Sequence, residues 1–115
     1  YQRNQIINFE EVYSELKKFG FIKYKLIGMS FLEQISLFKN AKYIIGAHGA
    51  GLANIIFSSP GCKFIEFRST SLNTSQYQFI SEMNEIDYNF INSKKIINQQ
   101  DQNIIVPINE LKTYL

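Results

Sequence analysis

The sequence predicts an α/β fold of the Rossmann-like type, with a mostly parallel sheet and helices on both faces. Segments with helical periodicity alternate with short β-rich segments, and a connection with three glycines joins one such strand to the helical stretch after it. The 115 residues are 45% hydrophobic, and no linker or repeat interrupts them. Residues 1–115 are therefore expected to form a single domain, with its ligand site at the carboxyl ends of the strands.

The first helix is expected to begin at Asn8 and to end near Gly20. Asn8 is placed as an N-cap with Glu11 three residues later, and Gly20 is the residue type that favours a left-handed backbone after a helix. Residues 21–27 alternate between apolar and polar side chains, which predicts a strand. The apolar positions of the helix recur every three or four residues at Phe9, Val12, Leu16 and Phe19.

The same alternation continues to the end of the chain. Ser30 and Glu33 have the spacing of a capping box, so a second helix is expected to start there. Strands are then expected at residues 42–46, 62–67 and 88–91, and helical stretches at 52–57, at 75–85 and from Pro107 onward, with a loop at 69–75 and a short apolar run at 104–106.

Charge and cysteine content disfavour several classes of protein. A formal net charge of +2 is too small to indicate nucleic acid as the main partner. Cys62 is the only cysteine, which excludes an internal disulfide and a cysteine-based zinc site, and we expect it to be a buried small residue and not a nucleophile.

No apolar run approaches the roughly 20 residues that span a bilayer. We expect a piece of a longer protein, without a membrane span or signal peptide, that is cytoplasmic, with membrane association in a bacterial source.

The most informative segment is the glycine-containing connection at residues 46–51. Gly46, Gly49 and Gly51 let backbone N–H groups approach an anion closely, and the helix that follows directs its positive end toward the same point. A phosphate group fits such a loop. The alternative is that the glycines only allow a tight turn between strand and helix.

His48, the only histidine, lies inside this loop. A single histidine is often a packed neutral residue, but its place among the glycines favours a side chain that faces a ligand. It could hydrogen-bond a phosphate and stabilise negative charge on a departing diphosphate.

Glu66 interrupts an apolar run near the end of the next strand. There it could accept hydrogen bonds from ribose hydroxyls, and the alternative is a solvent-facing residue of an edge strand. Arg3 and Arg68 are the only arginines, and they could contact phosphate or form surface salt bridges. Four aromatic residues are expected in the core, namely Tyr77, Phe79, Tyr88 and Phe90.

These residues resemble the C-terminal part of glycosyltransferase family 61. The resemblance is carried by residues 30–38 with Ala41, by residues 45–57, and by Pro60-Gly61 and Ile65-Glu66. The family includes capsular-polysaccharide-type bacterial proteins, plant xylosyl- and arabinosyltransferases, and animal protein O-linked N-acetylglucosaminyltransferases. Its members are similar to two-lobed GT-B enzymes, whose C-terminal lobe binds a nucleotide sugar.

The resemblance implies that this chain is the donor-binding lobe. It implies transfer of a sugar from a nucleoside-diphosphate sugar to an acceptor hydroxyl of a glycan or glycosylated acceptor, with inversion and without a metal or other cofactor. His48 would be the catalytic residue, and the missing N-terminal lobe would supply the general base, so the isolated piece is expected to be inactive. Ala53 departs from the Thr usual in the family. The residues that match are Gln34, Gly46, His48, Gly49, Ala50, Gly51, Leu52, Asn54 and Glu66.

Two other functions were weighed from the residues alone. Gly46 precedes Glu66 by 20 residues, the separation expected in a dinucleotide-binding oxidoreductase, but the glycines follow Gly-x-x-Gly-x-Gly and not Gly-x-Gly-x-x-Gly. A carbohydrate- or protein-binding module would instead expose a cluster of aromatic side chains, and the alternating aromatics fit core packing better.

Overall fold

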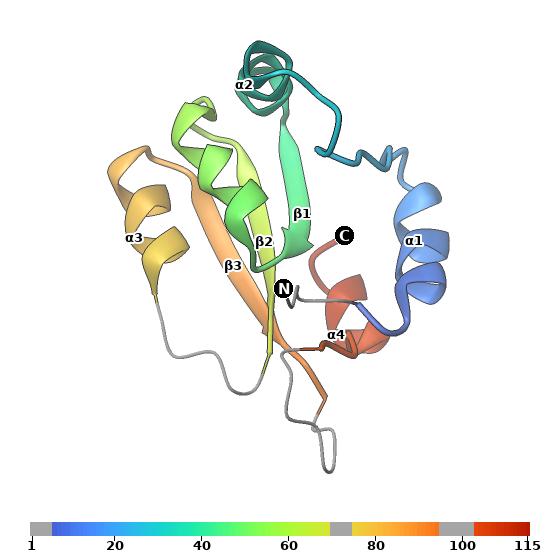
Figure 1. Ribbon diagram of the computed structural model, residues 1–115. Coiled ribbons are helices and arrows are strands. Elements are labelled where there is room, and N and C mark those ends of the chain that lie inside the picture. The colour runs from blue at the N-terminus through green and yellow to red at the C-terminus, as the bar shows by residue number, and fades with distance from the viewer. Residues whose placement is uncertain (1–5, 70–74, 95–102) are drawn as a thin grey trace.

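The computed structural model describes residues 6–69, 75–94 and 103–115 of the chain (Figure 1). Its three-stranded sheet contains β1 (Tyr43–Ala47), β2 (Lys63–Arg68) and β3 (Asp87–Asn92). The strands lie in the order β1-β2-β3, and both pairs are parallel. The predicted α/β fold with a parallel sheet is confirmed.

Helices cover both faces of this sheet. Helices α1 (Phe9–Lys17) and α4 (Ile108–Lys112) lie on one face, and the 3₁₀ helix η1 (Ala50–Phe57) and helix α3 (Gln76–Met83) lie on the other (Figure 1). Helix α2 (Phe31–Asn40) precedes β1 and contacts η1. Because η1 has only eight residues, the crossover from β1 to β2 is as short as the sequence predicted.

The alternation of side chains along β2 divides the core into two parts. Ile65 and Phe67 point to the α1 and α4 side, where they pack with Val12, Leu16, Ile91, Ile104, Val106 and Leu111. Phe64 points to the opposite side. There it packs with Phe38, Leu52, Ile55, Cys62, Tyr77 and Ile86. Cys62 is buried, as expected, and Glu66 shares the face of Phe64 because it lies two residues further along the strand.

Two helix boundaries confirm the sequence interpretation. The Glu33 backbone N–H donates to Ser30 Oγ at 3.1 Å, and the Ser30 backbone N–H donates to Glu33 Oε1 at 3.0 Å, which completes the capping box of α2. Gly20 has a φ of +85°, so it takes the left-handed backbone expected after α1.

The capping role expected for Asn8 is wrong in part. Asn8 does precede α1, but its side chain makes no capping hydrogen bond. Its Oδ1 accepts from the Val106 backbone N–H at 2.9 Å, and its Nδ2 donates to the Val106 carbonyl at 2.9 Å. The side chain therefore ties the start of α1 to the segment before α4.

Residues 21–27 form no strand, which corrects the prediction for this segment. Phe21 and Leu26 are half-buried against opposite parts of the core, whereas Ile22, Tyr24 and Ile27 are exposed. The side chains alternate as in a strand, but no backbone ladder joins the segment to β1. An alternating pattern shows which side chains are apolar, but it does not show whether another strand pairs with the segment through backbone hydrogen bonds.

The aromatic residues expected in the core divide in two. Tyr77 is buried and Tyr88 is half-buried, but Phe79 and Phe90 are exposed at 62% and 43%, so the prediction is wrong for those two. Ile104, in the apolar run near the C-terminus, forms an isolated parallel bridge with Ile6. Arg3 and most of the predicted loop at 69–75 lie outside the described residues.

Candidate functional site

The strands deliver the candidate residues to one end of the sheet. All three strands point the same way, so their carboxyl ends meet at the lower end of the view in Figure 1. His48 follows the last residue of β1, and its backbone N–H donates to the Phe67 carbonyl of β2 at 3.0 Å. Glu66 is paired with Gly46 across the β1 and β2 ladder. The sequence-predicted residues His48 and Glu66 therefore come together here.

Glu66 is buried at this end of the sheet, with an exposed fraction of only 1%. Its Oε2 contacts His48 Nδ1, and its Oε1 accepts a hydrogen bond from the Tyr88 hydroxyl. The Arg68 guanidinium lies 4.0 Å from Oε1. The prediction of a solvent-facing residue on an edge strand is wrong, because β2 is the central strand and the carboxylate faces inward.

Two tyrosines that sequence reasoning assigned only to the core complete this cluster. The Tyr77 hydroxyl donates to the Gly49 carbonyl, and its ring lies 4.7 Å from the His48 ring, centroid to centroid. Burial, and then the hydrogen bond to Glu66, raise the pKa of Tyr88 far above its ordinary value. Burial, and then the Glu66 charge, also raise the pKa of Tyr77. Both hydroxyls therefore stay protonated and can donate.

Tyr88 could have been identified as a site residue only if the register of the strands had been known. Once the strands are taken as parallel and in register, Tyr88 is the partner of Phe64 and lies on the same face as Glu66. The register is a property of the folded sheet, and the alternation of Tyr88 and Phe90 alone indicated no more than a strand.

Gly46 and Gly49 of the glycine-containing loop differ in whether the fold requires a glycine. A Cβ on Gly46 would lie 3.2 Å from Leu52 Cδ2, so this glycine lets Leu52 pack over the strand. Gly49 has a φ of 173°, which is ordinary extended backbone, and a Cβ there would meet only the Ala47 carbonyl at 3.9 Å. The fold itself therefore does not require glycine at position 49. Ala50 and Gly51 open η1.

Gln34 and Asn54, both carried over from the family resemblance, contact each other. Asn54 Nδ2 donates to Gln34 Oε1 at 2.8 Å, and Gln34 Nε2 donates to the Met29 carbonyl at 3.2 Å. The pair joins α2 to η1. These side chains thus brace the helix that follows the loop.

Arg68 lies beside the cluster, with its guanidinium 5.4 Å from the centre of the Phe90 ring. Its side chain is 13% exposed, which does not match the surface salt bridge considered from the sequence.

Burial raises the pKa of Cys62, which fits an inert thiol. Among the described residues, no three His, Cys, Asp or Glu side chains gather as they would around a metal ion.

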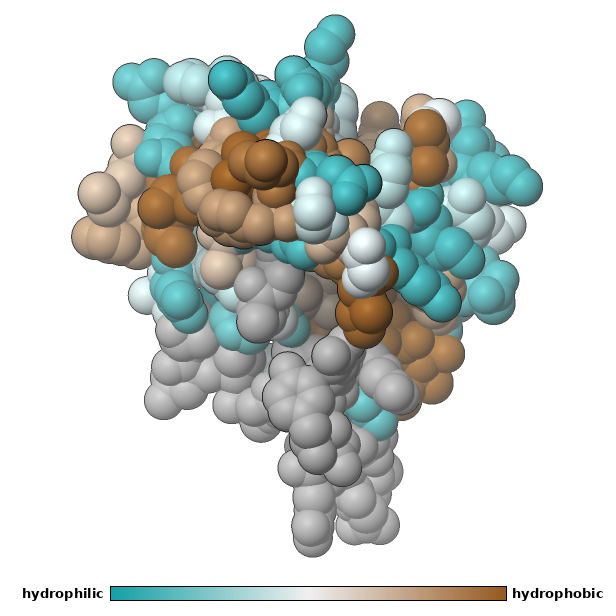
Figure 2. Space-filling model, turned by 45° about the horizontal axis from the view of Figure 1, so that its top comes forward, coloured by the Kyte–Doolittle hydropathy of each residue, from teal (hydrophilic) through white to brown (hydrophobic). Residues whose placement is uncertain are grey.

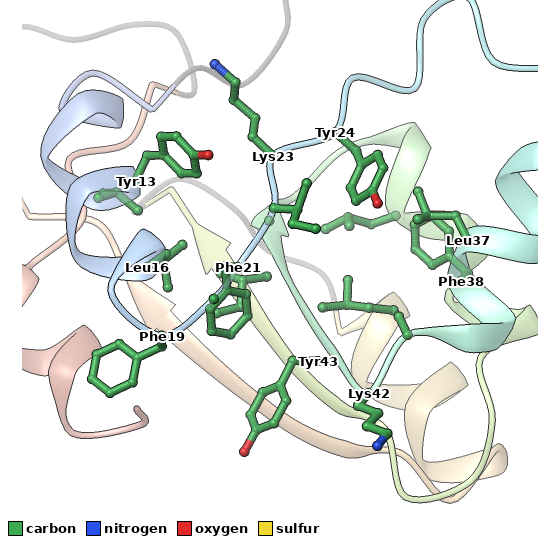
Figure 3. A pocket seen from close by; sticks show the side chains of 18 of the residues that line it. Tyr13, Leu16, Phe19, Phe21, Lys23, Tyr24, Leu37, Phe38, Lys42 and Tyr43 are labelled. Carbon is green, nitrogen blue, oxygen red and sulfur yellow. The ribbon is translucent and has the colours of Figure 1, made fainter.

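An apolar pocket of about 970 Å³ lies along the outer edge of β1. Figure 3 shows Phe21, Tyr24, Leu37 and Tyr43 among the side chains around it. Its walls are formed by α1, the segment at residues 19–26, α2 and β1.

Apolar side chains also reach the surface. The face in Figure 2 has hydrophobic patches between hydrophilic ones, and the exposed apolar residues of the described chain include Phe31, Leu32 and Ile56. None of the helices in residues 6–69, 75–94 and 103–115 is both long and apolar enough to cross a bilayer.

Comparison with known proteins gives a consistent picture. The family model described as Glycosyltransferase 61 matches residues 1–65, which include α2, β1 and the glycine-containing loop with His48. The chain is 28% identical over 97 residues to the beta-1,2-xylosyltransferase RCN11 of Oryza sativa subsp. japonica and 26% identical over 99 residues to a beta-1,2-xylosyltransferase of Arabidopsis thaliana.

These alignments cover 77% and 75% of this chain but only 18% of each relative. The chain thus spans about a fifth of the length of these curated relatives. No solved structure matches it. Since the family model covers more than half of the residues, this chain belongs to the glycosyltransferase 61 family.

Proposed function

We propose that this chain is the donor-binding domain of a glycosyltransferase, which binds a nucleoside-diphosphate sugar and transfers the sugar to an acceptor hydroxyl with inversion. The observation that carries the proposal is the His48–Glu66 contact, placed beside the glycine-containing loop at the carboxyl ends of parallel strands. Family membership supports the reaction class. Parallel α/β sheets bind their ligands at this end.

The loop would hold the diphosphate. Backbone N–H groups at the start of η1 are not used by the helix itself, so they can donate to an anion. Gly49 supports this placement, because neither its φ nor its surroundings exclude a side chain, and close approach of a phosphate remains as the reason for glycine. The loop and the start of η1 would be shaped by the other matching residues, Gly46, Ala50, Gly51, Leu52 and Asn54.

His48 would act on the leaving group. As the acceptor oxygen bonds to the anomeric carbon, the bond from that carbon to the diphosphate oxygen breaks and negative charge collects on the diphosphate. A donor placed at that oxygen lowers the barrier because it binds the transition state more tightly than the ground state. The His48 side chain is 16% exposed and the Glu66 side chain that contacts it is 2% exposed, so His48 is the member of this pair that reaches the surface.

Glu66 would support nucleotide binding in one of two ways. It could bind ribose hydroxyls, but the carboxylate is buried, and one of its partners, His48 or Tyr88, would then have to release an oxygen. It could instead act through His48. Nucleotides with ribose and with 2′-deoxyribose distinguish the two roles.

The acceptor and its general base belong to a second lobe under this proposal. The described residues around His48 offer tyrosine, glutamate and arginine side chains that already contact one another. The 115 residues are therefore expected to bind nucleotide without turnover. No metal ion is needed for the step as proposed, since loop N–H groups and His48 face the diphosphate.

Ligand-dependent thermal stability tests the proposal. The chain is titrated with a panel of nucleoside diphosphates, with UDP-xylose because two relatives are named xylosyltransferases, and with NAD and S-adenosylmethionine. A ligand at about 100 times its Kd stabilises the native state by about 2.7 kcal/mol. Stabilisation by a nucleoside diphosphate supports the proposal. Stabilisation by NAD alone would favour the dinucleotide-binding oxidoreductase, and no effect of any nucleotide would contradict both.

A further inference from the structure

Three different elements hold His48 and its loop. Glu66 of β2 contacts the imidazole, Tyr88 of β3 donates to Glu66, and Tyr77 of α3 lies against the imidazole and donates to Gly49. A buried carboxylate destabilises the fold unless its charge is compensated, so its place in the central strand calls for an explanation. These contacts end on His48, on the loop that carries it, or on the Glu66 carboxylate that contacts the imidazole.

We propose that Glu66 and Tyr88 are positioning residues that hold the neutral His48 ring as the tautomer with its proton on Nδ1. Nε2 is then the ring nitrogen that acts on the ligand. The inference rests on the proposed function for the identity of that ligand, a diphosphate. The tautomer itself is a property of the unliganded chain.

The direction of the hydrogen bonds follows from the chemistry of the groups. An ionised carboxylate only accepts hydrogen bonds, so the nitrogen that contacts Oε2 must carry the proton. The Tyr88 hydroxyl donates to Oε1, which fixes the carboxylate plane from the other side. In proteins the hydrogen bond made by one ring nitrogen decides the state of the other.

Glu66 and Tyr77 are buried more deeply than the His48 ring that they contact. The Glu66 side chain is 2% exposed and the His48 side chain is 16% exposed. Tyr77, with a residue exposure of 3%, fixes the loop against the ring through the Gly49 carbonyl. Glu66 and Tyr77 therefore support a side chain that is more exposed than they are. This is the arrangement expected of positioning residues.

The contact between Nδ1 and Glu66 leaves Nε2 as the ring nitrogen that can meet a diphosphate. With Nδ1–H directed to Glu66, a neutral ring presents an acceptor at Nε2 and a protonated ring presents a donor there. Phosphate oxygens accept hydrogen bonds. A diphosphate is therefore bound through Nε2 of the protonated ring, next to the Glu66 carboxylate and with Arg68, Tyr77 and Tyr88 around it.

The test uses the fact that His48 is the only histidine of the 115 residues, so its ring signals need no assignment. Long-range ¹H–¹⁵N spectra of the chain labelled with ¹⁵N-histidine distinguish the two neutral tautomers and the protonated ring. At a pH where the ring is neutral, the wild type is expected to show a proton on Nδ1. A proton on Nε2 would overturn the proposal, whatever the variants do.

Replacing both partners with apolar groups of similar size tests whether they set the tautomer. Glu66→Leu together with Tyr88→Phe removes the carboxylate and the hydroxyl that donates to it in one step, so neither group is left buried without the other. Arg68 loses the nearby carboxylate but is 13% exposed and keeps the Phe90 ring, so the fold is expected to survive. The Nδ1–H preference should give way to a mixture of both tautomers. Tyr43→Phe is the matched control, because Tyr43 is 44% exposed at the opposite end of β1. An unchanged spectrum in a folded double variant would refute the positioning role.

Binding of inorganic pyrophosphate separates this inference from the proposed function. The double variant should bind pyrophosphate about tenfold more weakly than the wild type, which corresponds to roughly 1.4 kcal/mol. The Tyr43→Phe control should bind it as the wild type does. If the wild type binds no pyrophosphate or nucleotide, the proposed function fails while the tautomer measurement still decides the geometry. Equal affinity of the folded double variant would show that the pair does not position His48 for its ligand.

Discussion

The carboxyl end of β1 and its outer edge differ in the contacts that hold their residues in place. At its carboxyl end, His48 and Glu66 are fixed by partners from β3 and α3. Along its outer edge, apolar side chains line a pocket of about 970 Å³, and the adjacent segment at 21–26 makes no ladder with the strand (Figure 3). Polar groups that must be satisfied specify a geometry, whereas apolar side chains require only that water is excluded.

This difference predicts that changes at the carboxyl end affect binding and catalysis, while changes along the outer edge affect stability or nothing at all.

His48→Ala should have the largest effect on activity. In the complete enzyme, turnover is expected to fall about a hundredfold or more, the usual result of removing one donor to developing charge. Stability of the 115-residue chain should change far less in relative terms, because the side chain reaches the surface. Steady-state kinetics and a denaturant titration measure the two effects, and normal turnover would remove His48 from the mechanism.

Glu66→Gln compares the two roles of the carboxylate. If Glu66 acts through His48, ligands with ribose and with 2′-deoxyribose should lose the same affinity, about 1.5–3 kcal/mol for a charge-assisted hydrogen bond. Isothermal titration with both ligands measures this. A loss confined to the ribose ligand would restore the direct ribose contact expected from the sequence.

Gly49→Val should separate ligand approach from folding. The backbone at position 49 is extended and a Cβ meets nothing closer than 3.9 Å, so the melting temperature should change little. Nucleoside diphosphate binding should weaken at least about tenfold, because the side chain occupies the space of the phosphate. Gly46→Ala is the useful contrast, since its Cβ would lie 3.2 Å from Leu52 and should destabilise the fold. Unchanged affinity in Gly49→Val would leave the loop as a turn only.

The sequence was sufficient to predict the parallel α/β fold, the capping box of α2 and the place of His48, because each depends on residues close together in the chain. The sequence was not sufficient to predict the surroundings of the Glu66 side chain. A glutamate in an apolar run is compatible with a ribose contact, a solvent-facing edge or a buried partner of histidine, and the central position of β2 excludes the solvent-facing edge.

Asn8 and residues 21–27 show the same limit for the fold. Asn8 has the local pattern of an N-cap, but a partner 98 residues away takes its side chain. The segment at 21–27 has a strand's alternation without a neighbour that pairs with it. Local pattern gives the tendency of a residue, and distant partners decide whether it is realised.

Lys25→Pro should have the smallest effect, and it tests the outer edge directly. Lys25 is exposed in the segment that makes no ladder with β1, so a proline there removes no ladder hydrogen bond. The free energy of unfolding should change by no more than about 0.5 kcal/mol, as for most surface substitutions. Amide hydrogen exchange of residues 22–25 in the wild type should be fast for the same reason, whereas β2 between its two neighbours should be protected. A loss of about 1 kcal/mol or more, together with slow exchange of these amides, would mean that the segment pairs with β1 as a fourth strand in solution and that the pocket closes.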